Sequence, residues 1–119
     1  MIMPSRVDID AHLPLKPLVF QILPGLAEGD RHGWSLVRDV QQRGGFARIM
    51  PGNFYRTLRG MLADGFIAES NRTTKSNDDE RRRYFTITPL GEAVARAEAR
   101  RLEAAVSEAR SKRLLAKRG

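Results

Sequence analysis

Apolar residues recur three or four positions apart in several stretches of the chain, which is the spacing of one face of an α-helix. The first stretch predicts a helix over 15–28, in which Pro24 is expected to kink or end the regular hydrogen bonding. A second stretch predicts a helix over 33–43. A third predicts a helix over 51–63, where Pro51 suits the first turn because its missing amide donor does no harm there.

The second half of the chain is predicted to contain a hairpin and a long helix. Residues 66–70 and 82–87 are typical of two short strands, and the polar segment 71–81 between them is predicted to project into solvent as a loop. Thr88 is well placed to cap a final helix that can continue to about residue 117.

This order of elements predicts a mostly α fold with a small β-hairpin, the winged helix-turn-helix, in which the third helix is offered to the DNA major groove. The expected division is an arm at 1–14 without assigned structure, a winged helix-turn-helix domain at 15–88, and a C-terminal dimerisation helix with a basic end at 89–119. A chain of 119 residues is too short for two independent hydrophobic cores, so a single core is expected.

The charge of the chain points to a polyanionic partner. The formal net charge is +7 at pH 7, which favours nucleic acid or an anionic membrane. Cysteine is absent, which excludes disulfides and thiolate metal sites and makes a reducing cytoplasm the default location. Neither a signal peptide nor a transmembrane stretch is evident, so no membrane partner is expected.

Four segments resemble a known family when they are taken together: HGW at 32–34, PGNFYRTL at 51–58, GFI at 65–67 and RRRYFTITPLG at 81–91. They resemble the PadR-like transcriptional regulators. The resemblance implies a homodimer, joined mainly by its C-terminal helices, that binds operator DNA, usually as a repressor, and performs no catalysis. Relatives that bind flat aromatic drugs use an aromatic side chain of the last helix, and residues 89–119 contain none, so we infer no small-molecule effector.

The third helix carries candidate base-reading residues on the side away from its apolar stripe. Asparagine and arginine can make paired hydrogen bonds to adenine and guanine, and tyrosine and threonine commonly bond phosphate oxygens. The alternative is an ordinary solvated helix face. The candidates are Asn53, Tyr55, Arg56, Thr57 and Arg59.

The predicted wing supplies positive charge and hydrogen-bond donors for the DNA backbone or minor groove. The acidic run 78–80 argues partly against this role, and such a charged loop can also be merely solvated. The candidate contacts are Arg72, Thr73, Thr74, Lys75, Arg81, Arg82 and Arg83.

The final helix has a narrow apolar seam that one small domain cannot bury, which favours pairing with a second copy. The alternative is a free basic tail that is solvated or touches nucleic acid. The seam consists of Leu90, Val94, Ala97, Leu102, Val106 and Ala109.

Two residues near the start of the second helix are given structural roles. His32 is interpreted as a helix cap or packing residue, because His12 is the only other histidine and no acidic or cysteine cluster accompanies either. Trp34 is interpreted as a core residue.

Two other functions are alternatives to a transcriptional regulator. One is a basic RNA-binding protein, and the other is a winged-helix adaptor that docks other proteins. An enzyme is disfavoured, because the sequence shows no nucleophile and base set, phosphate-binding glycine loop or metal-ligand spacing, and no cofactor or metal is expected.

Overall fold

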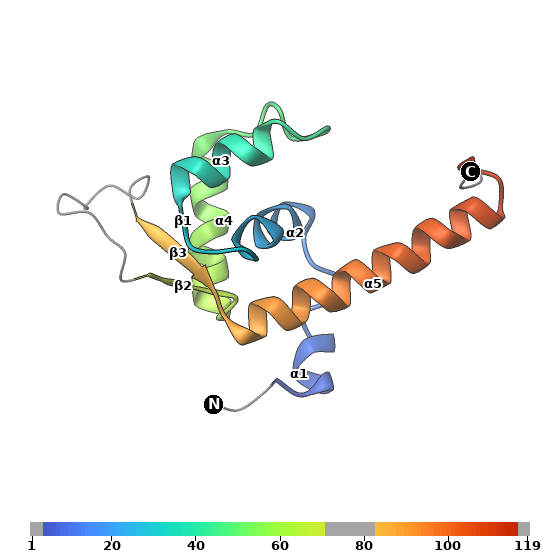
Figure 1. Ribbon diagram of the computed structural model, residues 1–119, viewed down its shortest axis with the longest axis horizontal. Helices are drawn as coiled ribbons and strands as arrows, with labels where there is room; N and C mark the ends of the chain where they lie inside the picture. Colours follow the sequence, from blue (N-terminus) through green and yellow to red (C-terminus); the bar gives the residue numbers. More distant parts are fainter. Residues whose placement is uncertain (1–3, 71–82, 117–119) are drawn as a thin grey trace.

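The computed structural model describes residues 4–70 and 83–116. Two layers make up the body, a bundle of short helices and a small antiparallel sheet, and a long C-terminal helix extends away from it (Figure 1). The elements are α1 (Arg6–Asp10), α2 (Pro17–Ile22), the 3₁₀ helix η1 (Leu23–Leu26), β1 (Arg31–His32), α3 (Gly33–Gln41), α4 (Pro51–Asp64), β2 (Ile67–Glu69), β3 (Tyr84–Ile87) and α5 (Pro89–Ser111).

The N-terminal segment contains a helix where the apolar pattern predicts none. Ser5 and Asp8 form a capping box at the start of α1: the Asp8 amide donates to Ser5 Oγ over 3.1 Å, and the Ser5 amide donates to Asp8 Oδ2 over 3.3 Å. This reciprocal capping stabilises a short helix through hydrogen bonds at its end. The helix has no buried residue, which is why the apolar pattern did not predict it.

The helix predicted over 15–28 is divided into two pieces. Regular α geometry holds from Pro17 to Ile22, and the chain then tightens into the 3₁₀ turn of η1. Pro24 has no amide hydrogen and therefore cannot continue the i to i−4 ladder. The expected interruption at Pro24 is confirmed, and the helix ends earlier than predicted.

The hairpin is part of a three-stranded antiparallel sheet in the order β1, β3, β2. The predicted pairing of β2 with β3 is confirmed, with Ile67 opposite Ile87 and Glu69 opposite Phe85. The third strand, β1, pairs His32 with Tyr84 and was not predicted, because two residues are too short for any alternation of polar and apolar positions to be visible.

The core draws fully buried side chains from α2, η1, α3, α4 and α5 and from the sheet. Ile22, Leu36, Phe54, Phe85 and Val94 are each at most 2% exposed. Burial of such side chains is the main source of stability in a domain of this size. None of the helices in 4–70 and 83–116 combines the length and the apolar character needed to cross a membrane.

A tight junction fixes the start of α5 against the end of α4. Gly65 ends α4 in the left-handed conformation, with φ of 83°, which glycine adopts without strain. Thr88 caps α5 as predicted: its Oγ1 accepts from the Gly91 amide over 3.0 Å and donates to the Gly65 carbonyl over 2.5 Å. One side chain therefore links the two helix ends.

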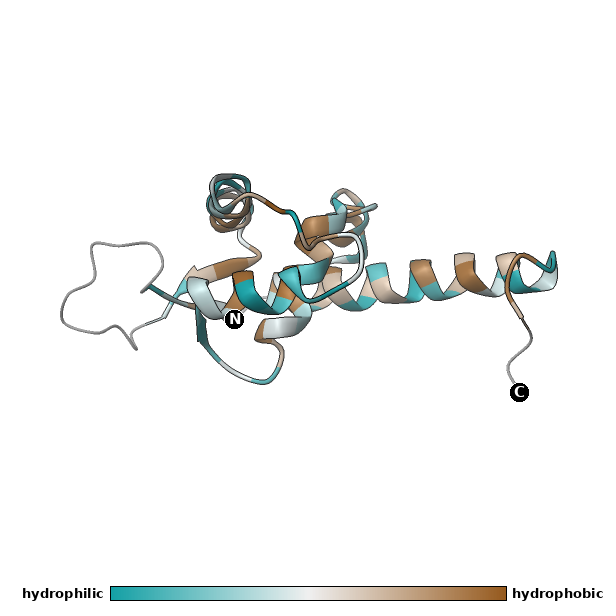
Figure 2. Cartoon of the chain, turned by 90° about the horizontal axis from the view of Figure 1, so that it is seen from above, coloured by the Kyte–Doolittle hydropathy of each residue, from teal (hydrophilic) through white to brown (hydrophobic). Residues whose placement is uncertain are grey.

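At its other end, α5 stops at Ser111 rather than near residue 117. Lys112 is the C-cap, and Arg113 has a φ of 64°, a left-handed conformation that ends a helix. Figure 2 shows apolar positions recurring along α5 well beyond the body.

Candidate nucleic-acid interface

The helix α4 begins abruptly at Pro51 and presents its first turns to solvent. Met50 is its N-cap in an extended conformation and makes no side-chain capping bond, and Pro51 and Gly52 are exposed. The amphipathic pattern divides the helix into a buried side, which includes Phe54 and Leu58, and an open side. An open N-terminal half is the geometry that recognition helices use in the major groove.

Two predicted contacts on the open side are held by each other. Arg56 Nη1 donates to Asn53 Oδ1 over 3.0 Å, and both residues are exposed. The paired groups are the planar amide and guanidinium that recognise base edges. The pair therefore presents an ordered donor and acceptor arrangement to any ligand that approaches α4.

The remaining predicted residues of α4 differ in accessibility. Arg59 is exposed, as expected. Thr57 is half-buried, and its Oγ1 donates to the Asn53 carbonyl over 2.9 Å within the helix. Its hydroxyl is thereby turned toward the helix backbone.

Tyr55 does not face outward, and this prediction is wrong. It is 9% exposed, and its ring meets that of Phe54 edge to face with centroids 5.8 Å apart. Tyr55 lies at the border of the apolar stripe, where a large ring gains more from packing than from exposure. It is therefore a core residue and is removed from the set that can reach DNA.

Arg56 and Thr57 also lie at the edge of a half-open hollow of about 530 Å³ between α4 and the chain segment that precedes α2. Lys16 and Asp64 contribute opposite charges to this hollow. The N-terminal segment thus brings a further cation close to the start of the recognition surface.

Most of the predicted wing contacts lie outside the described residues: Arg72, Thr73, Thr74, Lys75, Arg81 and Arg82. The base of the hairpin is described. The Ser70 amide donates to the Tyr84 carbonyl over 2.9 Å, Ser70 Oγ donates to Asp30 Oδ2 over 2.5 Å, and Arg83 Nε lies 3.4 Å from Glu69 Oε1. Arg83 is thus half-exposed at the base of the hairpin and paired with an acid.

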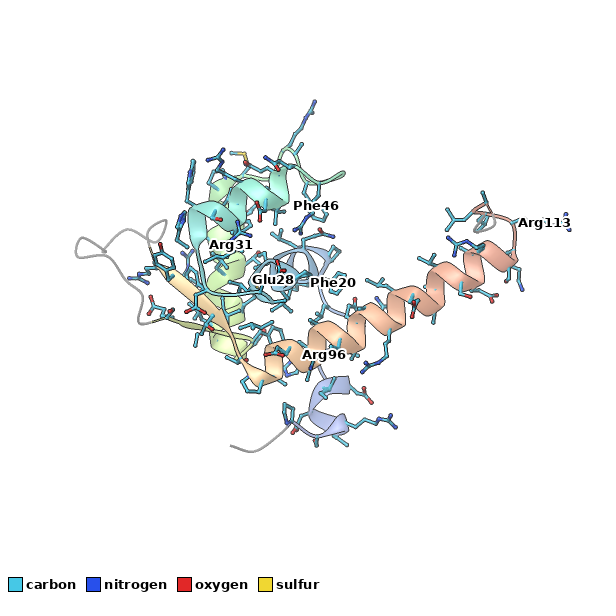
Figure 3. All side chains as sticks on the ribbon, in the orientation of Figure 1. Phe20, Glu28, Arg31, Phe46, Arg96 and Arg113 are labelled. Atoms are coloured by element: carbon cyan, nitrogen blue, oxygen red, sulfur yellow. The ribbon has the colours of Figure 1, made fainter. Side chains whose placement is uncertain are left out.

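The start of α3 is organised by His32 and by Arg31, whose side chains bond to residues of the first turns of the helix. His32 caps the helix, because its Nδ1 accepts from the Ser35 amide over 3.1 Å, which confirms the structural role given to this histidine. Arg31 donates to Asp39 and to Ser35 Oγ. The hydrogen bond to Asp39 is the largest cause of the lowered pKa of the Asp39 carboxyl. Arg31 belongs to β1, and Figure 3 labels it close to the first turns of α3.

Trp34 is not a core residue, and this prediction is also wrong. Its side chain is 44% exposed, although the next turn of α3 buries Leu36 and Val37. Trp34 lies on the outer side of the helix, where the elements in 4–70 and 83–116 leave it largely open to solvent.

The C-terminal helix is anchored to the body by its first turns. Val94 is fully buried within the chain, so it cannot contribute to a seam with a second copy, and its place in that seam is corrected. Leu90 and Ala97 are half-buried in the same region. Farther along, Leu102 and Ala109 are half-buried and Val106 is 42% exposed.

Glu98 is the last residue of α5 that is buried against the body, at 2% exposure. Its carboxylate accepts from Arg101 Nε over 2.6 Å and from Arg101 Nη2 over 2.9 Å. It also accepts from the Leu15 backbone. The Arg101 hydrogen bonds are the largest cause of the lowered pKa of Glu98. Within the described ranges, no group of histidine, cysteine or acidic residues has an arrangement that could hold a metal.

A helix-turn-helix whose second helix is open to solvent, followed by a hairpin and carried on a basic chain, defines a winged-helix nucleic-acid-binding protein. Residues 22–97 match the transcriptional regulator PadR-like family. The chain belongs to that family, which makes it a DNA-binding transcriptional regulator rather than an enzyme.

Individual relatives agree with this placement. Transcriptional regulator Rv3488 of Mycobacterium tuberculosis is 33% identical over 82 residues, which cover 69% of this chain and 72% of that protein. A transcriptional regulator from Clostridium thermocellum has a similar fold, with a TM-score of 0.63 at 18% identity over 90% of this chain and 95% of that one. Protein TA0346 from Thermoplasma acidophilum aligns with the same score and identity over 95% and 100% of the two chains.

Proposed function

We propose that this protein represses transcription by binding an operator in duplex DNA as a homodimer, in the cytoplasm. The observation that carries the proposal is the exposed, mutually bonded pair of Asn53 and Arg56 on the first turns of α4. Sequence is read by hydrogen bonds to base edges, and these two side-chain types make the bidentate contacts to adenine and guanine.

The pair lowers the cost of recognition because its members are already ordered. Fixing a long arginine side chain costs up to roughly 2 kcal/mol of conformational entropy. In the free protein the 3.0 Å bond to Asn53 restricts the Arg56 side chain before DNA arrives. In the complex the pair stays bonded, and its remaining donors and acceptor lone pairs contact neighbouring bases.

Charge on the wing supplies the part of the affinity that does not depend on sequence. We infer contacts to phosphates from Arg72, Lys75 and Arg81, with Arg83 at the base of the hairpin. Each phosphate that is neutralised releases counterions. Replacement of the first three by alanine should therefore weaken binding to all duplexes and lower the salt slope by up to about one unit per lost contact. An unchanged slope would leave the wing as a solvated loop.

Two copies joined through α5 would place two recognition helices on one face of the DNA. A two-fold dimer reads a palindromic site, with half-sites about one helical turn or a multiple of it apart. Repression follows if that site overlaps a promoter, because the bound dimer then blocks the polymerase.

The function is tested by selecting bound fragments of the source genome with the purified protein. We expect a shared palindromic sequence, tighter binding to it than to random duplex or to RNA of the same sequence, and lower expression of a reporter placed behind it when the protein is present. Recovery of fragments without a shared sequence, or stronger binding to RNA, would contradict the proposal and favour a general basic nucleic-acid-binding protein.

A further inference from the structure

The outer side of α3 carries an exposed aromatic and basic surface that the base-reading role of α4 does not explain. Trp34, Arg38 and Gln42 follow one another at intervals of four residues and are all exposed. We call these three residues the α3 surface. They border a shallow hollow of about 350 Å³, to which His32, Ser35 and Asp39 also contribute.

Trp34 is the single tryptophan of the chain, and 44% of its side chain is exposed. Contact with a ligand would remove the surface of this large apolar ring from water, which favours binding. The indole also carries an N–H donor at its edge. A ring of this kind can pack on a sugar and donate to a phosphate oxygen.

Arg38 supplies the charge that such a contact needs. Its side chain is exposed and makes neither a hydrogen bond nor an ion pair with any residue in 4–70 and 83–116, although its charge also helps to lower the pKa of Asp39. The one carboxylate in the hollow, Asp39, is already held by Arg31, which lowers its pKa and offsets its charge. The net character of the α3 surface is therefore cationic, which suits a polyanion.

The position of α3 next to α4 indicates that the polyanion is the DNA duplex proposed to bind α4. Helix α3 packs against α4 and lies across its N-terminal part, beside the end that carries Asn53 and Arg56 (Figure 1). When the second helix of a helix-turn-helix enters the major groove, the first helix crosses the adjacent strand of the DNA. The α3 surface and the open side of α4 would then contact the same duplex.

We propose that Trp34 and Arg38 bind the sugar-phosphate backbone of the strand that borders the groove occupied by α4. This inference rests on the proposed function, because it needs α4 in the groove. Trp34 packs on a deoxyribose and donates to a phosphate oxygen, and Arg38 neutralises a neighbouring phosphate. These contacts set the position of α4 and carry no sequence information.

Trp34 provides its own probe, because all tryptophan emission of the protein comes from it. Titration of the unmodified protein with duplex DNA should change the emission intensity or wavelength, in proportion to the fraction bound and for operator and random duplex alike. Dilution of the free protein should leave the emission unchanged. If the Trp34 emission does not change at saturating operator concentration, the proposal is overturned. It is also overturned if the emission changes on dilution of the protein and not on addition of DNA, which would assign the surface to a protein partner.

Substitutions give a second, independent test. We expect Arg38→Ala to weaken binding by on the order of three- to tenfold on both duplexes and to lower the salt slope by about one unit. Trp34→Phe should retain part of the affinity and Trp34→Ala less, with melting temperatures near that of the parent protein. Arg100→Ala is the matched control, because Arg100 is an exposed arginine on α5. The salt slope of the Arg100→Ala variant should equal that of the parent protein.

The backbone contact and the proposed function can be overturned separately. If the operator is bound specifically but Arg38→Ala leaves the salt slope at the parent value, the α3 surface is not a DNA contact and the proposed function stands. If the protein shows no preference for any duplex while Trp34 emission still responds to DNA, the backbone contact stands and operator reading fails. Absence of any duplex binding overturns both.

Discussion

At the scale of single residues, Gly91 is the position where the fold tolerates least change. A Cβ built at Gly91 would collide with the Phe66 carbonyl oxygen and would lie 3.0 Å from Ile87 Cγ1. The first turn of α5 therefore packs directly on the backbone that leaves α4. Because a backbone carbonyl cannot move aside as a side chain can, the helix itself would have to shift.

We predict that Gly91→Ala lowers the free energy of unfolding by about 1–3 kcal/mol, the usual cost of overpacking a rigid site. Gly60→Ala is the matched control, because Gly60 lies inside α4 and its added Cβ would meet no atom within 4 Å beyond its chain neighbours and the backbone of its own helix. It should raise stability by up to about 1 kcal/mol, since alanine favours helix over glycine. Chemical denaturation measures both, and a neutral Gly91 variant would refute the close approach.

The exposed pair on α4 gives the second prediction. Asn53→Ala or Arg56→Ala should weaken operator binding by about 1–3 kcal/mol and random-duplex binding much less, because only base-edge contacts discriminate between sequences. Both variants should melt like the parent, since the two side chains are exposed. Fluorescence anisotropy with labelled operator and random duplexes measures the two affinities.

Leu58→Ala is the contrasting variant on the same helix. Leu58 is 1% exposed, and loss of its side chain should cost about 2–5 kcal/mol of stability. Its effect on DNA binding should then be equal on both duplexes and should follow unfolding. Equal losses on both duplexes for the Asn53 and Arg56 variants would instead mark these two as phosphate contacts.

At the scale of elements, Glu98 determines how α5 is held on the N-terminal segment. Its carboxylate bridges Arg101 on its own helix and the backbone of Leu15, which precedes α2. Because the Arg101 hydrogen bonds lower the pKa of Glu98, the folded state prefers the ionised carboxylate. This contribution to stability is present above the unfolded-state pKa and is lost as the pH falls through the lower folded-state pKa.

We therefore predict that the protein loses stability on acidification below about pH 4.3, the ordinary pKa of glutamate, partly through Glu98. Glu98→Gln should cost about 1–3 kcal/mol near neutral pH and should show a shallower acid-side decline than the parent. Glu103→Gln, at an exposed position of the same helix, is the control and should leave the profile unchanged. Parallel acid-side profiles for parent and Glu98→Gln would rule out this role.

Only the elements that bury one regular face could be predicted from the periodicity of the sequence. The cores of α3 and α4 and the pairing of β2 with β3 could be predicted, because each buries one regular face. Helix α1 and strand β1 could not, because they are held by the Ser5 capping box and by pairing with Tyr84, which are single contacts rather than repeats. The helix boundaries at Pro24 and Thr88 could also be predicted, because a single residue with a known effect on helices fixes each of them.

The candidate site was predicted less well than the fold, and the errors lie at the borders of helix faces. Tyr55 and Trp34 were assigned in reverse: the tyrosine is buried and the tryptophan is exposed. Both lie at the edge of an apolar stripe, where the pattern of one helix leaves the side chain equally able to turn inward or outward. The outcome depends on which neighbour covers the edge, and that information is tertiary.

At the scale of the whole molecule, the chain is elongated, with principal extents of 53, 37 and 23 Å. The elongation comes from α5, whose 23 residues span about 35 Å at the usual rise per residue. The face of α5 that packs on the body through Val94 and Glu98 continues past it as Leu102 and Val106. An apolar stripe that outlasts its partner is typical of a helix that pairs with a second chain.

We predict that this distal stripe joins two copies. Removal of 102–119 should give monomers, and it spares Val94, Glu98 and Arg101, whereas a cut at residue 93 would open the core. Val106→Glu should have the same effect, because a charge at a buried seam costs several kcal/mol unless it is paired. Ala104→Glu, about 160° away around the helix, should remain dimeric.

Sedimentation at about 10–50 µM protein separates these outcomes, because the proposed interface requires the intact chain to be dimeric at such concentrations. If the parent sediments as a monomer, or if the Val106 and Ala104 variants behave alike, the stripe is not the dimer interface. Specific DNA binding by such a monomer would then rest on a single recognition helix, and the selected operator would contain one half-site instead of a palindrome.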